Sequence, residues 1–342
     1  MTGPLPGYLA PVTLPASFVY SRFVAARNRR FDRGRGVGSV GLPVISVGNL
    51  TLGGTGKTPM VIWLAQRLAA AGRHPVIAMR GYGPPAGLAG SSDEEAVYAQ
   101  RLPDVPVLAD PDRLGALRDF LNRASAREID CVLLDDGFQH RRIRRELDLV
   151  LIDASRGTLR DRLFPAGFLR EPPVNLQRAD AVIVTHARDV DNSFAGEIAG
   201  HHTKPPIAWS RHAWSAIVVY AGGGPPAREE VGWLRGKRVL TLLGLGNPGP
   251  VFEQLEAAGA TVAANIPARD HERYDRALMA VARTLSEGVD AFVTTAKDWV
   301  KARHLIDLPT WPVPVVVPRL EIEVFCGAEE LEDLLGRAFS GA

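Results

Sequence analysis

The chain has 342 residues, of which 46% are hydrophobic, 7% aromatic and 23% charged, and its formal net charge at pH 7 is +2. This composition excludes disordered and fibrous proteins, and the near-neutral charge gives no general basis for binding nucleic acid. At roughly 100–200 residues per domain, the length predicts about two domains, and no apolar run reaches the ~18 residues typical of a membrane-spanning helix. The two cysteines, Cys131 and Cys326, are too few for a disulfide framework and favour a reducing cytoplasm.

The first 36 residues combine apolar and basic side chains. Their pattern predicts a short helix over residues 16–31 with apolar bulk and a basic end. Asp32 is the one acidic residue among these 36. The apolar and basic side chains concerned are Leu14, Phe18, Val19, Tyr20, Phe23, Val24, Arg22, Arg27, Arg29, Arg30, Arg33 and Arg35. One interpretation is a membrane-surface helix attracted to anionic headgroups. The other is a helix packed on the domain with solvated arginines, and the pattern alone leaves both open.

From residue 43 onward, short apolar runs alternate with helical patterns. The runs predict strands over residues 44–47, 76–79, 131–134, 147–152 and 181–184, and helices over residues 59–71 and 112–124. Continuous apolar strands between helices are typical of a parallel sheet covered on both faces. We therefore expect a doubly wound, mainly parallel α/β sheet.

Residues 201–236 are rich in proline and glycine and predict a linker or hairpin. A second alternating block follows, with strands expected at 239–243, 260–264, 291–294 and 313–317 and helices at 250–258, 273–286 and 328–338. The predicted organisation is a basic N-terminal helix (1–36), a P-loop domain (37–212) and a second, smaller α/β domain (213–342).

The strongest local motif is G-N-L-T-L-G-G-T-G-K-T at residues 48–58, which follows a predicted strand and opens a predicted helix. Glycines let backbone N–H groups approach phosphate oxygens, and a helix N-terminus favours anions. The candidates for binding ATP are Gly53, Gly54, Thr55, Gly56, Lys57 and Thr58, with Lys57 on the β- and γ-phosphates and Thr58 on Mg²⁺. Thr51 replaces the first glycine of the usual P-loop. The result is similar to the MinD/ParA variant, except that Leu52 stands at its additional lysine.

Acidic residues follow this loop at two places. Asp135 and Asp136 end a predicted strand, where P-loop enzymes hold Mg²⁺. His140 lies shortly beyond, either in a substrate-binding wall or as a backbone cap in a polar turn. Asp93 and Glu94 open another helix, either because acids favour a helix N-terminus or as a general base and a further Mg²⁺ ligand.

Several arginines could bind a phosphorylated substrate: Arg80, Arg113 and Arg170, the last followed by Glu171. Taken singly, each of these arginines is more typical of a structural ion pair. The pair Asp270-His271, between a predicted strand and helix, is a weak signal by itself.

Taken in order, these motifs resemble the tetraacyldisaccharide 4'-kinases of lipid A synthesis. The resemblance rests on the P-loop, R-G-Y-G (80–83), D-E (93–94), D-D-G-F-Q-H (135–140), P-A-G-F-L-R-E-P (165–172), G-L-G-N-P (244–248), D-H (270–271) and T-T-A-K-D (294–298). It implies an ATP- and Mg²⁺-dependent kinase that phosphorylates the 4'-hydroxyl of a tetraacyl glucosamine disaccharide 1-phosphate, giving lipid IVA. It also implies a peripheral enzyme on the cytoplasmic face of the inner membrane, for which we expect a monomer and no nucleic-acid partner.

The resemblance also implies roles for individual residues. Asp93 matches the catalytic base and His271 its partner from the second domain, which would close on ATP. Lys57 and Thr58 match the phosphate and Mg²⁺ positions. Glu94, Asp135 and Asp136 match acids around the metal, and the substrate rim would comprise Arg80, Arg113, His140, Arg170 and Glu171.

The chain departs from the family pattern at Ser92, Glu95, Phe168, Ala296 and residues 157–162, which affects the expected acyl-chain preference and nucleotide contacts. Two other functions remain possible on the sequence alone. One is a MinD/ParA-like membrane-associated switch ATPase, which the missing lysine at Leu52 disfavours. The other is a small-metabolite kinase with an incidental basic helix.

Overall fold

The computed structural model describes residues 4–5, 9–53, 55–81, 93–123, 128–156, 158–245, 248–268 and 274–339. Within these ranges, the side chains of Ala10, Asp93, Glu94, Ala96 and Thr158 lie outside the description. The chain forms two compact units, unit 1 (Met1–Arg211 and Ile322–Ala342) and unit 2 (His212–Glu321). Two strands, β7 (Ala208–Tyr220) and β12 (Val315–Cys326), carry the chain from one unit to the other and back.

Unit 1 is built on a parallel sheet with strand order β7-β6-β5-β1-β4-β2-β3. Its other strands are β1 (Val44–Asn49), β2 (Pro75–Met79), β3 (Val107–Ala109), β4 (Cys131–Asp135), β5 (Leu147–Asp153) and β6 (Ala181–Thr185). Its α-helices are α1 (Ala10–Asp32), α2 (Lys57–Ala70), α3 (Asp93–Arg101), α4 (Arg113–Leu121), α5 (Asn192–His202) and α9 (Ala328–Arg337). The doubly wound, mainly parallel α/β class predicted from the sequence is confirmed.

Successive residues of the central strands face opposite sides of this sheet. Ile45 and Leu133 pack with α2, α3 and α9, whereas Val44 and Leu134 pack with α4. Alternating side-chain direction is a property of every strand, so a strand covered by helices on both faces must be apolar throughout. This explains the uninterrupted burial of β1, β2, β4, β5 and β6.

The parallel register brings the carboxyl ends of four strands to one edge of the sheet. Val47 is paired with Asp135, and Asp153 with Thr185. The segments that follow β1, β4, β5 and β6 therefore start side by side. Ligand sites in open α/β sheets form at this edge.

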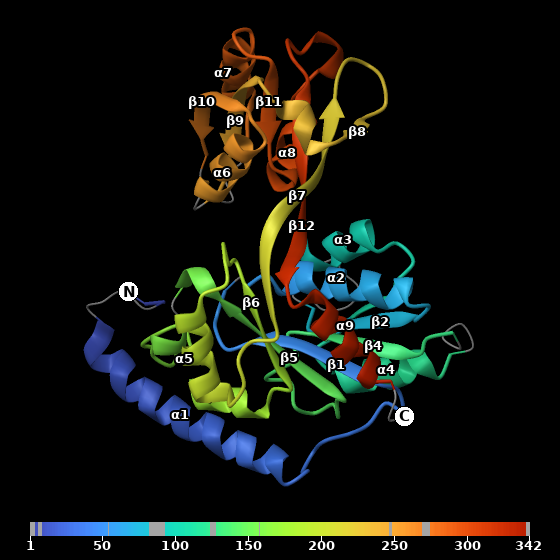
Figure 1. Ribbon diagram of the computed structural model, residues 1–342, viewed down its shortest axis with the longest axis vertical. Helices are drawn as coiled ribbons and strands as arrows, with labels where there is room; N and C mark the ends of the chain where they lie inside the picture. Colours follow the sequence, from blue (N-terminus) through green and yellow to red (C-terminus); the bar gives the residue numbers. More distant parts are fainter. Residues whose placement is uncertain are drawn as a thin grey trace. The chain divides into compact units, whose positions relative to one another are not determined.

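The N-terminal helix α1 begins earlier than predicted, at Ala10 rather than residue 16, and contains Pro11 and Pro15. Pro11 lies in the first turn, where no N–H is needed for a helical hydrogen bond. Figure 1 shows α1 along one edge of unit 1. Val24 on its inner side is 1% exposed, while Phe18 on its outer side is 68% exposed. Among the described residues, no helix is both long and apolar enough to cross a membrane.

Unit 2 contains a parallel sheet with strand order β10-β9-β11-β12. Its strands are β9 (Arg238–Leu243), β10 (Thr261–Pro267) and β11 (Ala291–Thr294), together with part of β12, and its helices are α6 (Gly249–Ala257), α7 (Arg276–Ser286) and α8 (Ala296–Ala302). The antiparallel partner of β7 is β8 (Ala227–Glu229). The β7–β8 hairpin lies inside the predicted linker or hairpin, although β7 itself is longer than that composition indicated.

The C-terminal limit of the predicted second domain, residues 213–342, differs from the structure. Residues 322–342 belong to unit 1. The reason is hydrophobic burial: Leu331 and Leu335 of α9 lie in the same core cluster as Ile45 and Leu64. Alternation of strands and helices in the sequence cannot reveal such a return of the chain.

Candidate active site

The loop between β1 and α2 is held in place by side chains at its base. Asn49 is fully buried, and its amide donates hydrogen bonds to the hydroxyls of Thr55 (2.8 Å) and Thr51 (3.3 Å). Its side-chain oxygen accepts from the ammonium of Lys57 at 3.4 Å. From the end of β6, the Thr185 hydroxyl donates to the Thr55 carbonyl at 3.0 Å. Neighbouring strands therefore fix the shape of this loop.

Two glycines of the loop have backbone conformations that favour glycine. Gly53 and Gly56 adopt φ angles of +101° and +80°, which L-residues with side chains rarely tolerate. A Cβ on Gly53 would lie 2.9 Å from a guanidinium nitrogen of Arg156. Gly56 directly precedes α2, so Lys57 and Thr58 occupy its first two positions, where free N–H groups attract anions. Gly54 lies outside the described residues.

Two cations meet the carboxylate of Asp136, which follows β4 in a left-handed conformation (φ 51°). One nitrogen of Arg170 donates to both of its oxygens, at 2.8 and 2.9 Å, and the Lys57 ammonium lies 3.6 Å from one of them. Burial alone would raise the pKa of Asp136. The positive charges of Lys57, Arg170 and Arg113 outweigh burial and lower this pKa below its ordinary value, so the carboxylate stays ionised.

Asp135 is almost completely buried, and the Tyr98 hydroxyl of α3 donates to its Oδ2 at 2.8 Å. Arg113, 3% exposed, donates to the backbone carbonyls of Asp135 (2.7 Å) and Asp136 (3.2 Å). Arg113 therefore lies beneath the turn that carries both acids. These contacts hold the turn in place.

The turn continues into Gln139 and His140. Gln139 donates to the Asn49 carbonyl at 2.9 Å and accepts from Arg170 at 3.4 Å, which links β1 to the turn. Burial, together with the charges of Arg113 and neighbouring arginines, lowers the pKa of His140 to about 4. Its Nε2 is buried and has no hydrogen-bond partner among the residues that the structure describes. A neutral imidazole with an unused nitrogen can bind a hydroxyl group but cannot supply a positive charge to a phosphate.

Known proteins are similar to this chain along almost its whole length. A family model described as tetraacyldisaccharide-1-P 4'-kinase, LpxK, matches residues 9–339. The chain belongs to this family.

Curated relatives and a solved structure cover most of the chain. A tetraacyldisaccharide 4'-kinase of Syntrophus aciditrophicus is 37% identical over 83% of this chain and 82% of its own length. The enzyme of that name from Anaeromyxobacter dehalogenans strain 2CP-C is 36% identical over 97% of this chain and 92% of its own. The crystal structure of "apo" form LpxK from Aquifex aeolicus in complex with ATP is 28% identical, with a TM-score of 0.67, covering 95% of this chain and 98% of that one.

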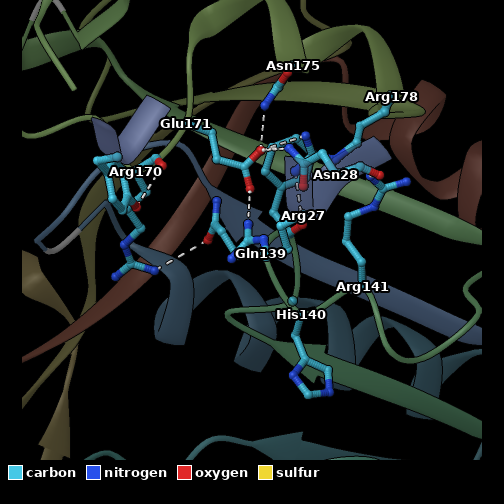
Figure 2. Close-up of polar contacts among 12 residues, drawn as sticks. Arg27, Asn28, Gln139, His140, Arg141, Arg170, Glu171, Asn175 and Arg178 are labelled. Atoms are coloured by element: carbon cyan, nitrogen blue, oxygen red, sulfur yellow. Dashed lines mark hydrogen bonds and ion pairs between the residues drawn. The ribbon is translucent and has the colours of Figure 1, made fainter. Parts of the chain in front are cut away.

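Among the family positions, Glu171 lies deepest. Its side chain is fully buried and accepts hydrogen bonds from Arg27 (2.9 Å), Asn28 (2.9 Å), Asn175 (2.6 Å) and Arg178 (2.7 Å). Figure 2 shows these donors converging on the carboxylate from different elements, with Arg170 directed toward Gln139. Glu171, which the resemblance predicts at the substrate rim, is therefore enclosed by protein donors and is not exposed to a substrate.

Other predicted residues of this family site are placed only in part. Arg80 is exposed directly after β2. Asp93 and Glu94 begin α3, but their side chains lie outside the described part of the chain, as does His271 altogether. Within the described residues, no three His, Cys, Asp or Glu side chains form a metal-binding group. The pairing of Asp93 with His271 and the metal role of Glu94 stay predictions.

Sequence reasoning missed a polar cluster at the ends of β5 and β6. Asp153, 2% exposed, accepts from both the backbone and the hydroxyl of Ser155 (2.9 and 2.6 Å) and lies 3.2 Å from His186 Nδ1. Arg156 lies 3.5 Å from the same carboxylate and reaches the phosphate loop at Gly53. The available signal was an aspartate directly after a predicted strand, as at Asp135.

Proposed function

We propose that the loop over residues 48–58 binds the phosphates of ATP while the chain phosphorylates the 4'-hydroxyl of a tetraacyl glucosamine disaccharide 1-phosphate. As a member of its family, the chain is an ATP-dependent lipid kinase of lipid A synthesis. The observation that carries the assignment to this loop is the meeting of Lys57 and Arg170 at Asp136, beside the first turn of α2. Family membership favours this function over a MinD/ParA-like switch ATPase.

Phosphoryl transfer depends mainly on positioning and on neutralising the negative charge of the transferred group. Lys57 and Arg170 provide two positive charges at the loop. Lys57 is hydrogen-bonded to Asn49 of β1, and Arg170 to Gln139, which in turn binds the Asn49 carbonyl. We assign Lys57 to the β- and γ-phosphates and Arg170 to the transferred phosphoryl group.

The oxygen-rich edge of the sheet also fits Mg²⁺, which prefers carboxylate and hydroxyl ligands. Thr58, Asp135 and Asp136 offer such oxygens, and the lowered pKa of Asp136 keeps one of them charged. When bound, Mg²⁺ would neutralise phosphate charge. Glu94 is proposed as a further ligand on the family resemblance alone.

Asp93 is proposed to accept the proton of the 4'-hydroxyl, with His271 adjusting its basicity. We propose His140 as a neutral hydrogen-bonding group for the sugar, because its Nε2 is buried and unused among the described residues. Arg80 is proposed to meet the substrate phosphate, since its side chain is exposed at the same edge of the sheet. Arg113 and Glu171 are proposed to hold the backbone of the site in place rather than to bind substrate.

The outer side of α1 supports binding to the membrane surface. Its exposed apolar side chains include Val12, Leu14, Phe18, Val19 and Phe23, and a groove at the C-terminal end of the helix is lined by Ala26, Arg29, Arg30, Arg33 and Arg35. Apolar insertion combined with arginines suits a surface of anionic lipids. We propose a peripheral, monomeric enzyme on the cytoplasmic face of the inner membrane, where ATP is available.

The test is transfer of labelled phosphate from γ-labelled ATP into the purified disaccharide lipid. The proposal predicts labelled lipid with the native chain and none without Mg²⁺. ATP-dependent dimers that form without lipid labelling would instead support the switch ATPase.

A further inference from the structure

We propose that α1 positions Arg170 for phosphate transfer through the buried carboxylate of Glu171, so that this helix is a working part of the active site. The inference rests on the proposed function of the phosphate loop. It assigns Tyr20, Arg27 and Asn28 as positioning residues. Their role is separate from membrane binding by the outer side of α1.

The buried carboxylate of Glu171 depends on hydrogen-bond donors from α1. A fully buried carboxylate is stable only when charged or polar donors surround it. Of its four donors in the described part of the chain, Arg27 and Asn28 belong to α1, while Asn175 and Arg178 belong to the 3-10 helix η5 (Pro173–Arg178). Loss of the α1 contacts would leave half of this carboxylate's hydrogen bonds unmade (Figure 2).

Helix α1 also binds the backbone beside Arg170 directly. The Tyr20 hydroxyl donates to the Arg170 carbonyl at 3.0 Å, and the Tyr20 ring packs edge-on against Phe164 at 5.9 Å. One turn earlier, the Ser17 hydroxyl donates to the Leu163 carbonyl (2.8 Å) and accepts from the Ala166 amide (2.9 Å). Three turns of α1 therefore hold the segment 163–171.

Segment 163–171 is in turn hydrogen-bonded to the phosphate loop. The Arg170 amide donates to the Leu50 carbonyl at 2.7 Å, and the Leu52 amide donates to the Phe168 carbonyl at 2.7 Å. The segment thus forms a short antiparallel bridge with the loop. Since the Arg170 guanidinium also binds Asp136, a shift of segment 163–171 would move both the arginine and the backbone of the loop.

The two roles of α1 use different side chains. Phe18, Val19 and Phe23 are about two thirds exposed (68%, 67% and 65%), whereas Asn28 is only 8% exposed. Ser21 is a suitable comparison within the same helix, because among the residues that the structure describes its hydroxyl donates to the Phe18 carbonyl of its own turn and not to segment 163–171. Substitutions can therefore test the inner contacts without altering the outer surface.

The experiment measures kcat and KM of the full chain on detergent-solubilised lipid, where binding to a bilayer is not required. Asn28→Ala and Tyr20→Phe are expected to lower kcat about tenfold, the cost of a lost hydrogen bond to a buried charged or backbone group near the reacting site, while KM for ATP changes less than about twofold. Ser21→Ala is expected to match the native chain. Thermal unfolding monitored by circular dichroism verifies that each variant is folded.

A double-mutant cycle separates positioning from a general loss of structure. In an Arg170→Ala background, Asn28→Ala should cause almost no further loss of kcat, because the residue that it positions is absent. An undiminished loss in that background, or native kcat in Asn28→Ala and Tyr20→Phe, would overturn the proposal.

Hydrogen exchange gives a readout that does not depend on the reaction. In Asn28→Ala, the amides of residues 163–171 should exchange faster than in the native chain, and in Ser21→Ala they should not. Unchanged exchange in Asn28→Ala would also overturn the proposal. If the variants show these exchange differences but the native chain does not phosphorylate the lipid, the proposed function is contradicted and the structural link between α1 and segment 163–171 still holds.

Discussion

At Arg170, one guanidinium nitrogen serves both oxygens of Asp136 and also reaches Gln139. The sequence predicted Arg170, Asp136 and Lys57 as site residues because of their motifs. It did not predict Asn49 or Tyr98 as residues that hold this site, because a buried asparagine in a strand and a tyrosine in a helix carry no local signal for a role at a distance.

Replacing Arg170 by glutamine removes its charge while keeping a polar side chain of similar shape. We expect kcat to fall about 10²-fold, because the arginine neutralises charge in the transition state. Steady-state kinetics on solubilised lipid measure the effect. Arg160→Gln is the matched control, since Arg160 forms an exposed ion pair with Glu197 at 2.7 Å. Native kcat in Arg170→Gln would contradict the assigned role.

The lowered pKa of His140 makes stability depend on pH. The folded chain binds this proton only near pH 4, whereas an unfolded histidine binds it at about 6.5. Between these values the unfolded state holds more protons, so the free energy of unfolding should fall as the pH falls from about 6.5 to about 4.

Urea unfolding across this range tests the assignment. His140→Gln should reduce the pH-dependent loss of stability, while His304→Gln, at an exposed position, should leave it as in the native chain. An equal pH dependence in the native chain and in His140→Gln would show that His140 does not have the lowered pKa.

Among the elements, the strands of unit 1 were the most predictable, because a buried parallel strand is apolar along its whole length. The sequence missed α5, α8, β3 and the length of β7. Arg211 and Ser215 interrupt the apolar pattern of β7, so its composition resembled that of a linker. The contacts between α1 and Glu171 join residues 143 or 144 positions apart, and no local pattern encodes such a pairing.

The outer side of α1 leads to a prediction about membrane binding. Replacing Phe18 and Phe23 together by serine should reduce the fraction of the chain that floats with anionic vesicles, because both side chains are exposed and would lose favourable apolar burial in the lipid. Val281→Ser, at an exposed apolar position of α7, serves as the control. Undiminished flotation of the double variant would contradict membrane binding through α1.

For the whole molecule, the chain leaves unit 1 in β7 and returns to it in β12. The predicted order of helix, P-loop domain and second domain described the first crossing but not the return. The return is specified by the packing of α9 on the sheet of unit 1, which depends on contacts with strands far away in the sequence.

This packing predicts which part of the chain α9 stabilises. Leu331→Ala should lower the free energy of unfolding of unit 1 by about 2–5 kcal/mol, because the leucine is fully buried in its core. Leu285→Ala, at a position 41% exposed in α7, should have a much smaller effect. The loss of stability is measured by chemical denaturation in which hydrogen exchange of the β1 and β4 amides is monitored. Unchanged protection of these strands in Leu331→Ala would contradict the assignment of α9 to unit 1.

The loop at residues 48–58 is proposed to transfer phosphate from ATP to the 4'-hydroxyl of the disaccharide lipid. The most direct measurement is mass spectrometry of that lipid after incubation with ATP and Mg²⁺, with fragmentation to locate the new phosphate, for the native chain and for Lys57→Ala. We expect a 4'-phosphorylated product with the native chain and almost none with Lys57→Ala. Equal amounts of product from both chains would show that Lys57 is not needed for transfer, and a phosphate at another position would show that the 4'-hydroxyl is not the acceptor.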